Sequence, residues 1–302
     1  MKKIMMVGLL LTMMVAVQAQ VKVAPKMAKG MQKVYVTESK VGIPGQPEFN
    51  MTAETKYSVT GAVKGGYTME VVTTDFKCDA TDNNIAAKLM SAPFELLKGL
   101  TVRVTTDQDG QVKSIDNFAE LKKKVDEVGG QLVNELFEKV SMLSQVMDKE
   151  TLKKQVLSNV TPESMLKSMQ VTNSPLMLNG KTVTMGMQED YTADYGLKMK
   201  RMYFVNGNKI TTNGSLNMSK DDMKQLIIKE VEKIMPSQAD MVKENIDQLM
   251  DSGMAKIDSK ETATYELQDD GWVKSILAET TYQMMGQNTK TVVRVEIKDS
   301  LT

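Results

Sequence analysis

The stretch Thr101–Ile115, TVRVTTDQDGQVKSI, reads as two short strands around a turn, and it returns near the far end of the chain as Thr262–Ile276, TATYELQDDGWVKSI. Both copies contain D-G-x-V-K-S-I at the same place. An Asp-Gly pair between two alternating runs is typical of a type I′ hairpin turn, because both central residues of that turn need positive φ angles. The repeat therefore predicts two equivalent hairpins and a duplication of the chain. It says more about architecture than about activity.

The sequence before each copy has a similar pattern. In each half of the chain it predicts three strands and a helical region, followed by the hairpin. The segment from Asn173 to Gly180, NSPLMLNG, lies near the middle and has the composition of a connector. We therefore place the boundary there, with residues 20–172 as the first half and residues 173–302 as the second. The fold class that follows is α+β, a curved antiparallel sheet from two duplicated halves with Met-rich helices over one face.

Several local signals predict where elements begin and end. Thr81 can cap a helix, and Pro93 opens a further short turn after that helix. The pair Gly129-Gly130 interrupts the longest helical pattern, and two glycines cost roughly 2 kcal/mol relative to alanine inside a helix, so we expect a kink or a break there. Residues 20–30, which hold a proline and a glycine, read as a short mobile lead.

The N-terminus has the pattern of a secretory signal. Two lysines precede the apolar run Ile4–Val17, and small residues precede a cleavage site between Ala19 and Gln20, so residues 1–19 are interpreted as a signal peptide. No later segment approaches about 18 uninterrupted apolar residues, which predicts that the protein is not an integral membrane protein. The single cysteine, Cys78, lies far from the cleavage site, so no lipid anchor is expected, and we interpret it as a buried small side chain. The predicted location is the periplasm or outer cell envelope.

Composition narrows the chemistry. The chain has 38 basic and 38 acidic residues and no histidine. Balanced charge without basic clusters beside aromatics argues against nucleic acid as a partner. The absence of histidine removes His-ligated zinc and both serine–histidine and cysteine–histidine catalysis. We therefore expect no enzyme, no cofactor and no metal ion.

Two motifs suggest chemistry but have simpler interpretations. Asp107 and Asp109 precede a glycine as in a calcium loop, yet the EF-hand spacing is not met, and a hairpin turn explains the same residues. Ser164 and Lys167 match the S-x-x-K element of acyl-serine enzymes, but the third element of that site is missing. The sequence therefore nominates no catalytic residue, no metal ligand and no defined set of ligand-binding residues.

Methionine is unusually abundant, with 27 in the chain. Three interpretations remain open. Methionine can replace leucine and isoleucine as a flexible core side chain. It can also line an adaptable apolar groove for a lipid or a partner helix. A third interpretation is Cu(I) binding by thioethers, for which Met185 and Met187 would place two sulfur atoms on one strand face.

The segment Leu97–Leu121, LKGLTVRVTTDQDGQVKSIDNFAEL, in which a strand, a D-x-x-G turn and a second strand lead into a helix, resembles exported Gram-negative envelope proteins of unknown function. Those proteins are similar to the lipoprotein-carrier and mycobacterial lipoprotein half-barrels. The resemblance implies a curved antiparallel sheet that holds helices on its concave side and can enclose an acyl chain. It carries over no functional residue, because the family has no site motif to match.

Together these features predict an exported, non-enzymatic envelope protein. Its predicted ligand is apolar, such as a lipid or an acyl chain, held between the sheet and the helices. The alternative is a structural or interaction protein of the envelope that has a protein partner and no small-molecule ligand. A cavity between helices and sheet would distinguish the two.

Overall fold

The computed structural model of the chain describes residues 20–81, 84–139, 148–158, 160–193, 196–234, 239–253, 255–284 and 287–298. The predicted signal peptide, residues 1–19, lies outside these ranges, so the cleavage between Ala19 and Gln20 stays a prediction. No helix in the described ranges has the length and apolar content needed to cross a bilayer.

The elements of the described residues follow one another from a short N-terminal strand to a long final strand. The strands are β1 (Gln20–Lys22), β2 (Gln32–Gly42), β3 (Phe49–Val63), β4 (Gly66–Cys78), β5 (Thr101–Asp107), β6 (Val112–Ile115), β7 (Thr182–Thr184), β8 (Gln188–Thr192), β9 (Lys198–Asn206), β10 (Lys209–Leu216), β11 (Ile257–Leu267), β12 (Val273–Met284) and β13 (Gln287–Ile297). The helices are α1 (Ile85–Leu97), α2 (Phe118–Lys139), α4 (Lys149–Ser158), α5 (Pro162–Ser168), α6 (Lys220–Ile234) and α7 (Ala239–Asp251).

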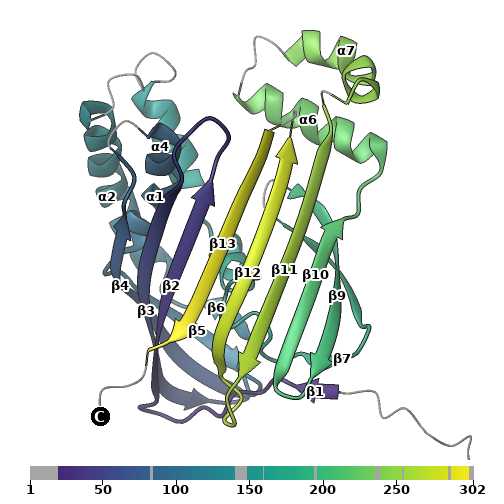
Figure 1. Cartoon of the computed structure of the whole chain (residues 1–302). Coiled ribbons are helices and arrows are strands. Elements are labelled where there is room, and N and C mark those ends of the chain that lie inside the picture. Colours follow the sequence, from purple (N-terminus) through teal and green to yellow (C-terminus); the bar gives the residue numbers. More distant parts are fainter. Residues whose placement is uncertain are drawn as a thin grey trace, which may run out of the picture.

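Eleven antiparallel strands form one curved sheet in the order β6-β5-β4-β3-β2-β13-β12-β11-β10-β9-β8 (Figure 1). The predicted α+β class and the antiparallel sheet are confirmed. The two halves share this sheet and meet where β2 pairs with β13. In each half a helical insertion joins two neighbouring strands, α1 between β4 and β5 and the pair α6–α7 between β10 and β11. Each hairpin therefore follows such an insertion, with β6 at one edge of the sheet and β12 in its interior.

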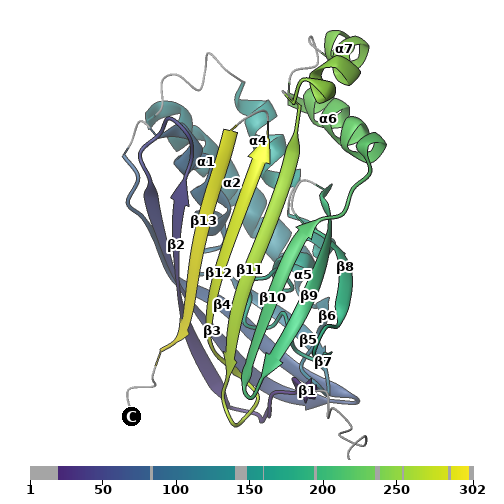
Figure 2. The same cartoon turned by 45° about the vertical axis from the view of Figure 1, so that its right-hand side comes forward.

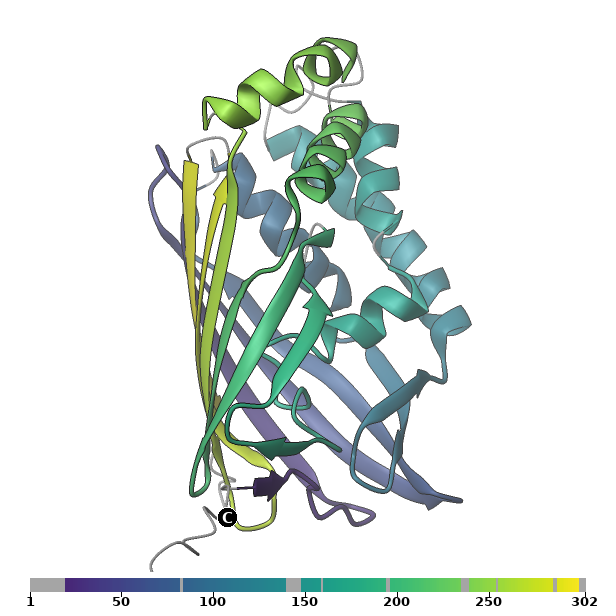
Figure 3. The ribbon, with the colours of Figure 1, turned by 90° about the vertical axis from the view of Figure 1, so that its right-hand side faces the viewer.

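The helices lie on the concave side of the sheet, which we call the inner face (Figures 2 and 3). Helix α1 packs on β4, α2 on β5 and α5 on β6. Helices α6 and α7 sit at one end of β10 and β11, and β1 lies at the opposite end of the sheet (Figure 1). The central strands β2, β13 and β12 thus run between two separate groups of helices.

The two hairpins have the same turn, but it is not the predicted type I′ turn. In the first copy the amide of Gly110 donates to the carbonyl of Asp107 at 3.1 Å, and the amide of Asp107 donates to the carbonyl of Gln111 at 2.9 Å. The second copy repeats both bonds around Gly271, at 2.9 and 2.8 Å. The two glycines have φ angles of 81° and 82°. This pattern is a three-residue loop whose last position needs glycine.

Residues 23–31 form what we call the strap, which is fixed across both hairpin tips. The amide of Lys26 donates to the carbonyl of Asp270 at 2.8 Å, and the indole nitrogen of Trp272 donates to the carbonyl of Lys26 at 3.0 Å. The expectation of a mobile lead is therefore wrong. Buried hydrogen bonds and the burial of Val23 outweigh the turn-forming composition of this segment.

The hairpin glycines also let the strap approach closely. A Cβ atom at Gly271 would lie 2.8 Å from the carbonyl oxygen of Ala24. A Cβ atom at Gly110 would lie 2.8 Å from side-chain atoms of both Pro25 and Met27. The duplicated motif therefore has one structural role in two places, since each copy presents a bare backbone to the same strap.

The predicted connector is the most consistently buried segment of the inner face, and we call residues 171–180 the plug. Leu176, Met177 and Leu178 are buried in the main core. The side chain of Asn179 donates to the carbonyl of Gly110 at 3.1 Å. The composition of a surface loop is misleading here, because the turns of the plug are satisfied by hydrogen bonds inside the core.

Three further expectations need correction. Asn84, not Thr81, caps α1, and its side chain accepts from the amide of Ala87 at 3.0 Å. Helix α1 continues through Pro93 instead of ending before it. Helix α2 is also continuous through Gly129-Gly130. The reason is packing, because a Cβ atom at Gly129 would lie 2.8 Å from a methyl group of Leu157 in α4.

Candidate functional site

The buried side chains of the inner face form separate clusters. The largest fills the end of the sheet that carries the strap, and it includes Val23, Tyr35, Met69, Val104, Leu178, Tyr203, Tyr265 and Trp272. At the other end one cluster lies at α1 and includes Val41, Phe49, Met51, Phe76 and Ala87. A second lies at α6 and α7 and includes Leu197, Met199, Ile227, Val231, Ile246 and Ile257. The end of the sheet next to the strap is therefore filled by buried side chains. The middle of the inner face lies between this cluster and the two clusters at the other end.

A row of short side chains crosses the inner face between these clusters, and we call it the hydroxyl strip. It consists of Thr37 and Ser39 of β2, Ala53 and Thr55 of β3, Thr73 of β4, Thr280 of β12, and Thr289 and Thr291 of β13. The strand register places them on the inner face, since Thr37 lies opposite the core residue Val295 and Thr280 lies opposite Thr291. All of them are partly exposed. The strip thus has members on five neighbouring strands, and between β2 and β13 the buried side chains Val41, Val293 and Val295 lie directly opposite them.

Most hydroxyl groups of the strip are unused by the protein. Thr55 and Thr73 approach each other at 3.4 Å between their Oγ1 atoms. Within the described part of the chain, the other five hydroxyls form no hydrogen bond with a protein group; they belong to Thr37, Ser39, Thr280, Thr289 and Thr291. Each can donate one hydrogen bond and accept others. The strip therefore offers neutral hydrogen-bonding groups to water or to a ligand.

An exposed aromatic ring borders the strip on one side. Phe94 of α1 stacks on Phe76 with ring centroids 5.3 Å apart, and 46% of its surface is exposed. Phe76 lies opposite Ala53 in the sheet, which places the Phe94 ring beside the floor of the strip. On the other side Tyr282, opposite Thr289, packs against the cluster at α6 and α7. The floor is thus short and polar, and its borders are apolar.

A buried ion network lies next to the strip on β9 and β11. The side chain of Arg201 is 4% exposed, and its Nη2 atom donates to Glu261 at 2.9 Å and to Thr172 of the plug at 2.7 Å. The hydroxyl of Tyr191 also donates to Glu261, at 2.8 Å. Burial alone would lower the pKa of Arg201, but the adjoining carboxylate raises it above its ordinary value. Arg201 therefore stays charged and anchors the plug.

The same network continues to the edge of the sheet. Glu189 of β8 accepts two hydrogen bonds from Lys181, at 2.7 and 2.8 Å, and one from the hydroxyl of Tyr203. Burial favours the protonated form of Glu189, yet these donors together with Arg201 hold its pKa below its ordinary value. Burial and the neighbouring carboxylate raise the pKa of Tyr203. Two cations thus face two carboxylates, and this part of the site is electrically balanced.

This network was not predicted from the sequence. Neither Glu189 nor Arg201 is among the residues for which the sequence suggests a chemical role. The alternation of β9 contained a signal, because Arg201 stands at an inward position between Met199 and Tyr203. A charge at a core position of a strand indicates a buried partner.

The residues of the two motifs that suggested chemistry, the calcium-like loop and the S-x-x-K element, form hydrogen bonds that stabilise local structure. The carboxylate of Asp107 accepts from the amides of Asp109 and Gln111 at 3.0 and 2.9 Å, as expected of a hairpin turn. Ser164 belongs to the capping box of α5, and Lys167 donates to the carbonyl of Ala193 at 2.9 Å. Among the described residues no group of three acidic, cysteine or histidine side chains is placed to hold a metal ion.

The methionines mostly follow the core interpretation where the structure describes them. Those that are buried are Met27, Met51, Met69, Met165, Met177 and Met199. Met185 lies in a turn before β8 and is exposed, so it does not share a strand face with Met187 as the copper interpretation required. Cys78 is half-buried beside the cluster at α1, and not buried as expected.

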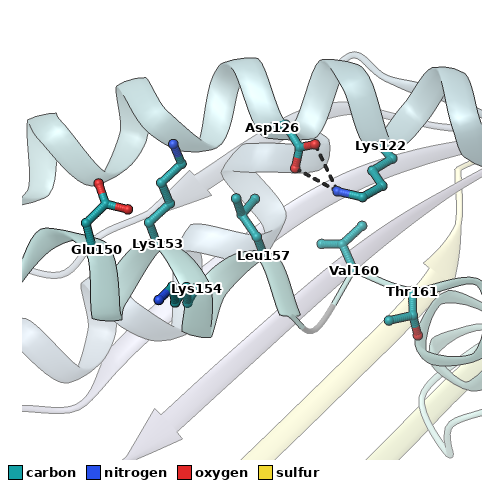
Figure 4. A pocket seen from close by; sticks show the side chains of 8 residues that line it. All are labelled: Lys122, Asp126, Glu150, Lys153, Lys154, Leu157, Val160 and Thr161. Atoms are coloured by element: carbon teal, nitrogen blue, oxygen red, sulfur yellow. Dashed lines mark hydrogen bonds and ion pairs between the residues drawn. The ribbon is translucent and has the colours of Figure 1, made fainter.

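A pocket of about 480 Å³ opens between α2 and α4 (Figure 4). Its lining residues are Lys122, Asp126, Glu150, Lys153, Lys154, Leu157, Val160 and Thr161. Lys122 and Asp126 pair with each other at 2.9 Å across one turn of α2. Mixed charges on exposed helix surfaces are ordinary, so we place the functional site at the strip and not here.

No family model matches the chain, and no curated protein shows significant similarity to it. The solved structures that the comparison returned include a lipovitellin structure titled for its lipid–protein interactions, with 10% identity, a TM-score of 0.37 and coverage of 90% of this chain. The chain spans about a quarter of that lipovitellin chain, 25%. A mutant Rh. blastica porin has 5% identity, a TM-score of 0.29 and coverage of 89% and 99% of the two chains. An outer membrane channel from Pseudomonas putida has 7% identity, a TM-score of 0.15 and coverage of 91% and 98%. Similarity at this level decides no function.

Proposed function

We propose that the protein is an exported, non-enzymatic protein of the cell envelope that binds an amphiphilic ligand, with its acyl chain lying along the hydroxyl strip. One observation carries the proposal: short, partly exposed side chains form a floor between two taller apolar clusters on the inner face. Neighbouring strands are about 4.8 Å apart, so a strip over five strands is roughly 20 Å long. That length suits an extended alkyl chain.

The borders of the strip support the same ligand. The exposed ring of Phe94 would lose its contact with water when an apolar chain lies against it, which favours binding in proportion to the area covered. The filled strap end limits the ligand to the half of the inner face that lies toward α6 and α7. A ligand there would lie on the inner face, the side of the sheet that also carries the helices.

The non-enzymatic part of the proposal rests on the groups beside the strip. Glu261 is the carboxylate next to the strip, and Arg201 and Tyr191 already hold it through short hydrogen bonds. Both bonds go to its Oε1 atom, and the carboxylate balances the charge of the buried Arg201, so we assign Glu261 a structural role. The envelope location rests on the predicted signal peptide.

The test is binding of a fluorescent long-chain acyl probe to the protein and to two variants of neighbouring residues. Thr280 faces the strip, and Thr281 faces the outer side of the same strand. We expect Thr280→Phe to fill the floor and weaken binding at least tenfold, whereas Thr281→Phe leaves it unchanged. Far-ultraviolet circular dichroism is the control for whether both variants fold.

Equal affinities of the two variants would place the ligand elsewhere and contradict the proposal. If the unaltered protein binds no acyl probe at all, the alternative of an envelope interaction protein without a small ligand is favoured. Chemical cross-linking in the cell envelope would then identify the protein partner.

A further inference from the structure

We infer that the polar part of the bound amphiphile is uncharged and carries ester or hydroxyl groups, as in a monoacylglycerol. This inference rests on the proposed function and names the class of ligand for the same site. It follows from two properties of the strip in the described part of the chain: the charged groups of the network beside it are paired, and five of its hydroxyls have no protein partner.

The charge beside the strip is already neutralised. Glu261 lies opposite Thr280 in the sheet and is the acidic group at that end of the strip. Its side chain is 12% exposed, and Arg201 pairs with it at 2.9 Å. A charged head group in this place would have to leave water without a free counter-charge, which is strongly unfavourable.

The rest of the nearby network gives no free charge either. Lys181 and Glu189 pair with each other at 2.7 Å. Arg201 also lies 3.5 Å from Glu189, so each cation of this network already has a carboxylate partner. Displacing Glu261 for a ligand would leave the buried charge of Arg201 without its nearest partner, which is strongly unfavourable.

The hydroxyls, in contrast, are free and well placed. The pair Thr280 and Thr291 stands directly opposite across β12 and β13, and neither hydroxyl has a protein partner in the described residues. Ser39 and Thr37 lie further along the inner face of β2, opposite Val293 and Val295 of β13. Ester carbonyls accept from such hydroxyls, and glyceryl hydroxyls both donate and accept. A neutral, oxygen-rich group is therefore the complement of this surface.

The experiment is isothermal titration of the intact protein with three amphiphiles of one chain length, each below its micelle-forming concentration. They are a monoacylglycerol, the corresponding fatty acid at pH 8, where it is an anion, and the corresponding alkylammonium. We expect the monoacylglycerol to bind at least tenfold more tightly than either ion. The double variant Thr280→Val with Thr291→Val should remove most of this preference, because valine keeps the shape of threonine and removes its hydroxyl.

The matched control is the outer-face pair Thr211 and Thr264, whose Oγ1 atoms lie 3.3 Å apart. Their double change to valine should leave the preference intact. Equal or tighter binding of either ion overturns the inference and leaves the proposed function standing. A preference that survives in Thr280→Val with Thr291→Val also overturns it. If none of the three amphiphiles binds, the proposed function fails and the inference fails with it.

Discussion

The clearest test of the architecture is the change Gly271→Ala at the tip of the second hairpin, with Gly65→Ala as its control. Both glycines have left-handed backbones, with φ angles of 82° and 87°. An alanine in that conformation costs roughly 1–2 kcal/mol at either position. The two sites differ in their surroundings, because an added Cβ atom at Gly65 meets no atom within 4 Å, whereas at Gly271 it lies 2.8 Å from the backbone of the strap.

The strap has two possible responses to Gly271→Ala. If it moves, it loses the hydrogen bonds of Lys26 with Asp270 and with Trp272, which contribute about 1 kcal/mol each. If it stays, it carries overpacking strain of about 1–3 kcal/mol. Either response adds about 2 kcal/mol, so we expect the free energy of unfolding to fall by about 3–4 kcal/mol, against about 1–2 kcal/mol for Gly65→Ala.

Urea unfolding followed by circular dichroism and by tryptophan fluorescence measures the difference. Trp272 is the only tryptophan of the chain, and it is buried under the strap, so its emission reports directly on this contact. Gly110→Ala should fall between the other two variants, because its close contacts are ends of side chains that can move. Equal losses for Gly65→Ala and Gly271→Ala would refute the idea that the repeated hairpins hold the strap.

Three further predictions concern helix packing and the buried network. Gly130→Ala should raise the free energy of unfolding by up to about 1 kcal/mol, because its methyl group meets only a lysine nitrogen at 3.9 Å, while Gly129→Ala should lose that gain to a contact of 2.8 Å with a leucine of α4; urea unfolding compares them. Arg201→Met should cost about 3–5 kcal/mol, and a double-mutant cycle with Glu261→Gln should recover part of the loss by removing the unpaired carboxylate. The folded-state pKa of Glu189 lies below its ordinary value of 4.5, so its contribution to stability is present above that pH and is lost as the pH falls through the folded pKa; unfolding of Glu189→Gln should show a smaller loss of stability below about pH 4.5.

The sheet was largely readable from alternation. Thr291, Val293 and Val295 alternate along the last strand as residues of one sheet face do, and the structure places them on the inner face. The sequence could not show which part of that face is covered. Val293 and Val295 are buried by the core, while Thr291 stays partly exposed, and this difference depends on helices that pack elsewhere in the sheet.

The plug and the strap escaped prediction for a common reason. The asparagine, proline and glycine residues within 171–180 correctly predict that this segment forms turns. Turns usually lie at the surface, so the same composition also suggests exposure. Burial of those turns depends on partners far away in the chain, such as Gly110 for Asn179 and Tyr265 for the carbonyl of Thr172. Local composition indicates the conformation of a segment but not the place where it packs.

A comparison of the two halves also indicates where a site can form. The two halves agree at their hairpins, and there both copies meet the strap and the plug, so that end of the sheet becomes solid core. The halves differ in their insertions, since α1 alone follows β4 while α6 and α7 follow β10. These unequal insertions leave the central strands between two groups of helices, and the residues there are Thr37, Thr280 and their short neighbours. The similar hairpins therefore build the solid core, and the unequal helical insertions leave uncovered the floor on which we place the ligand.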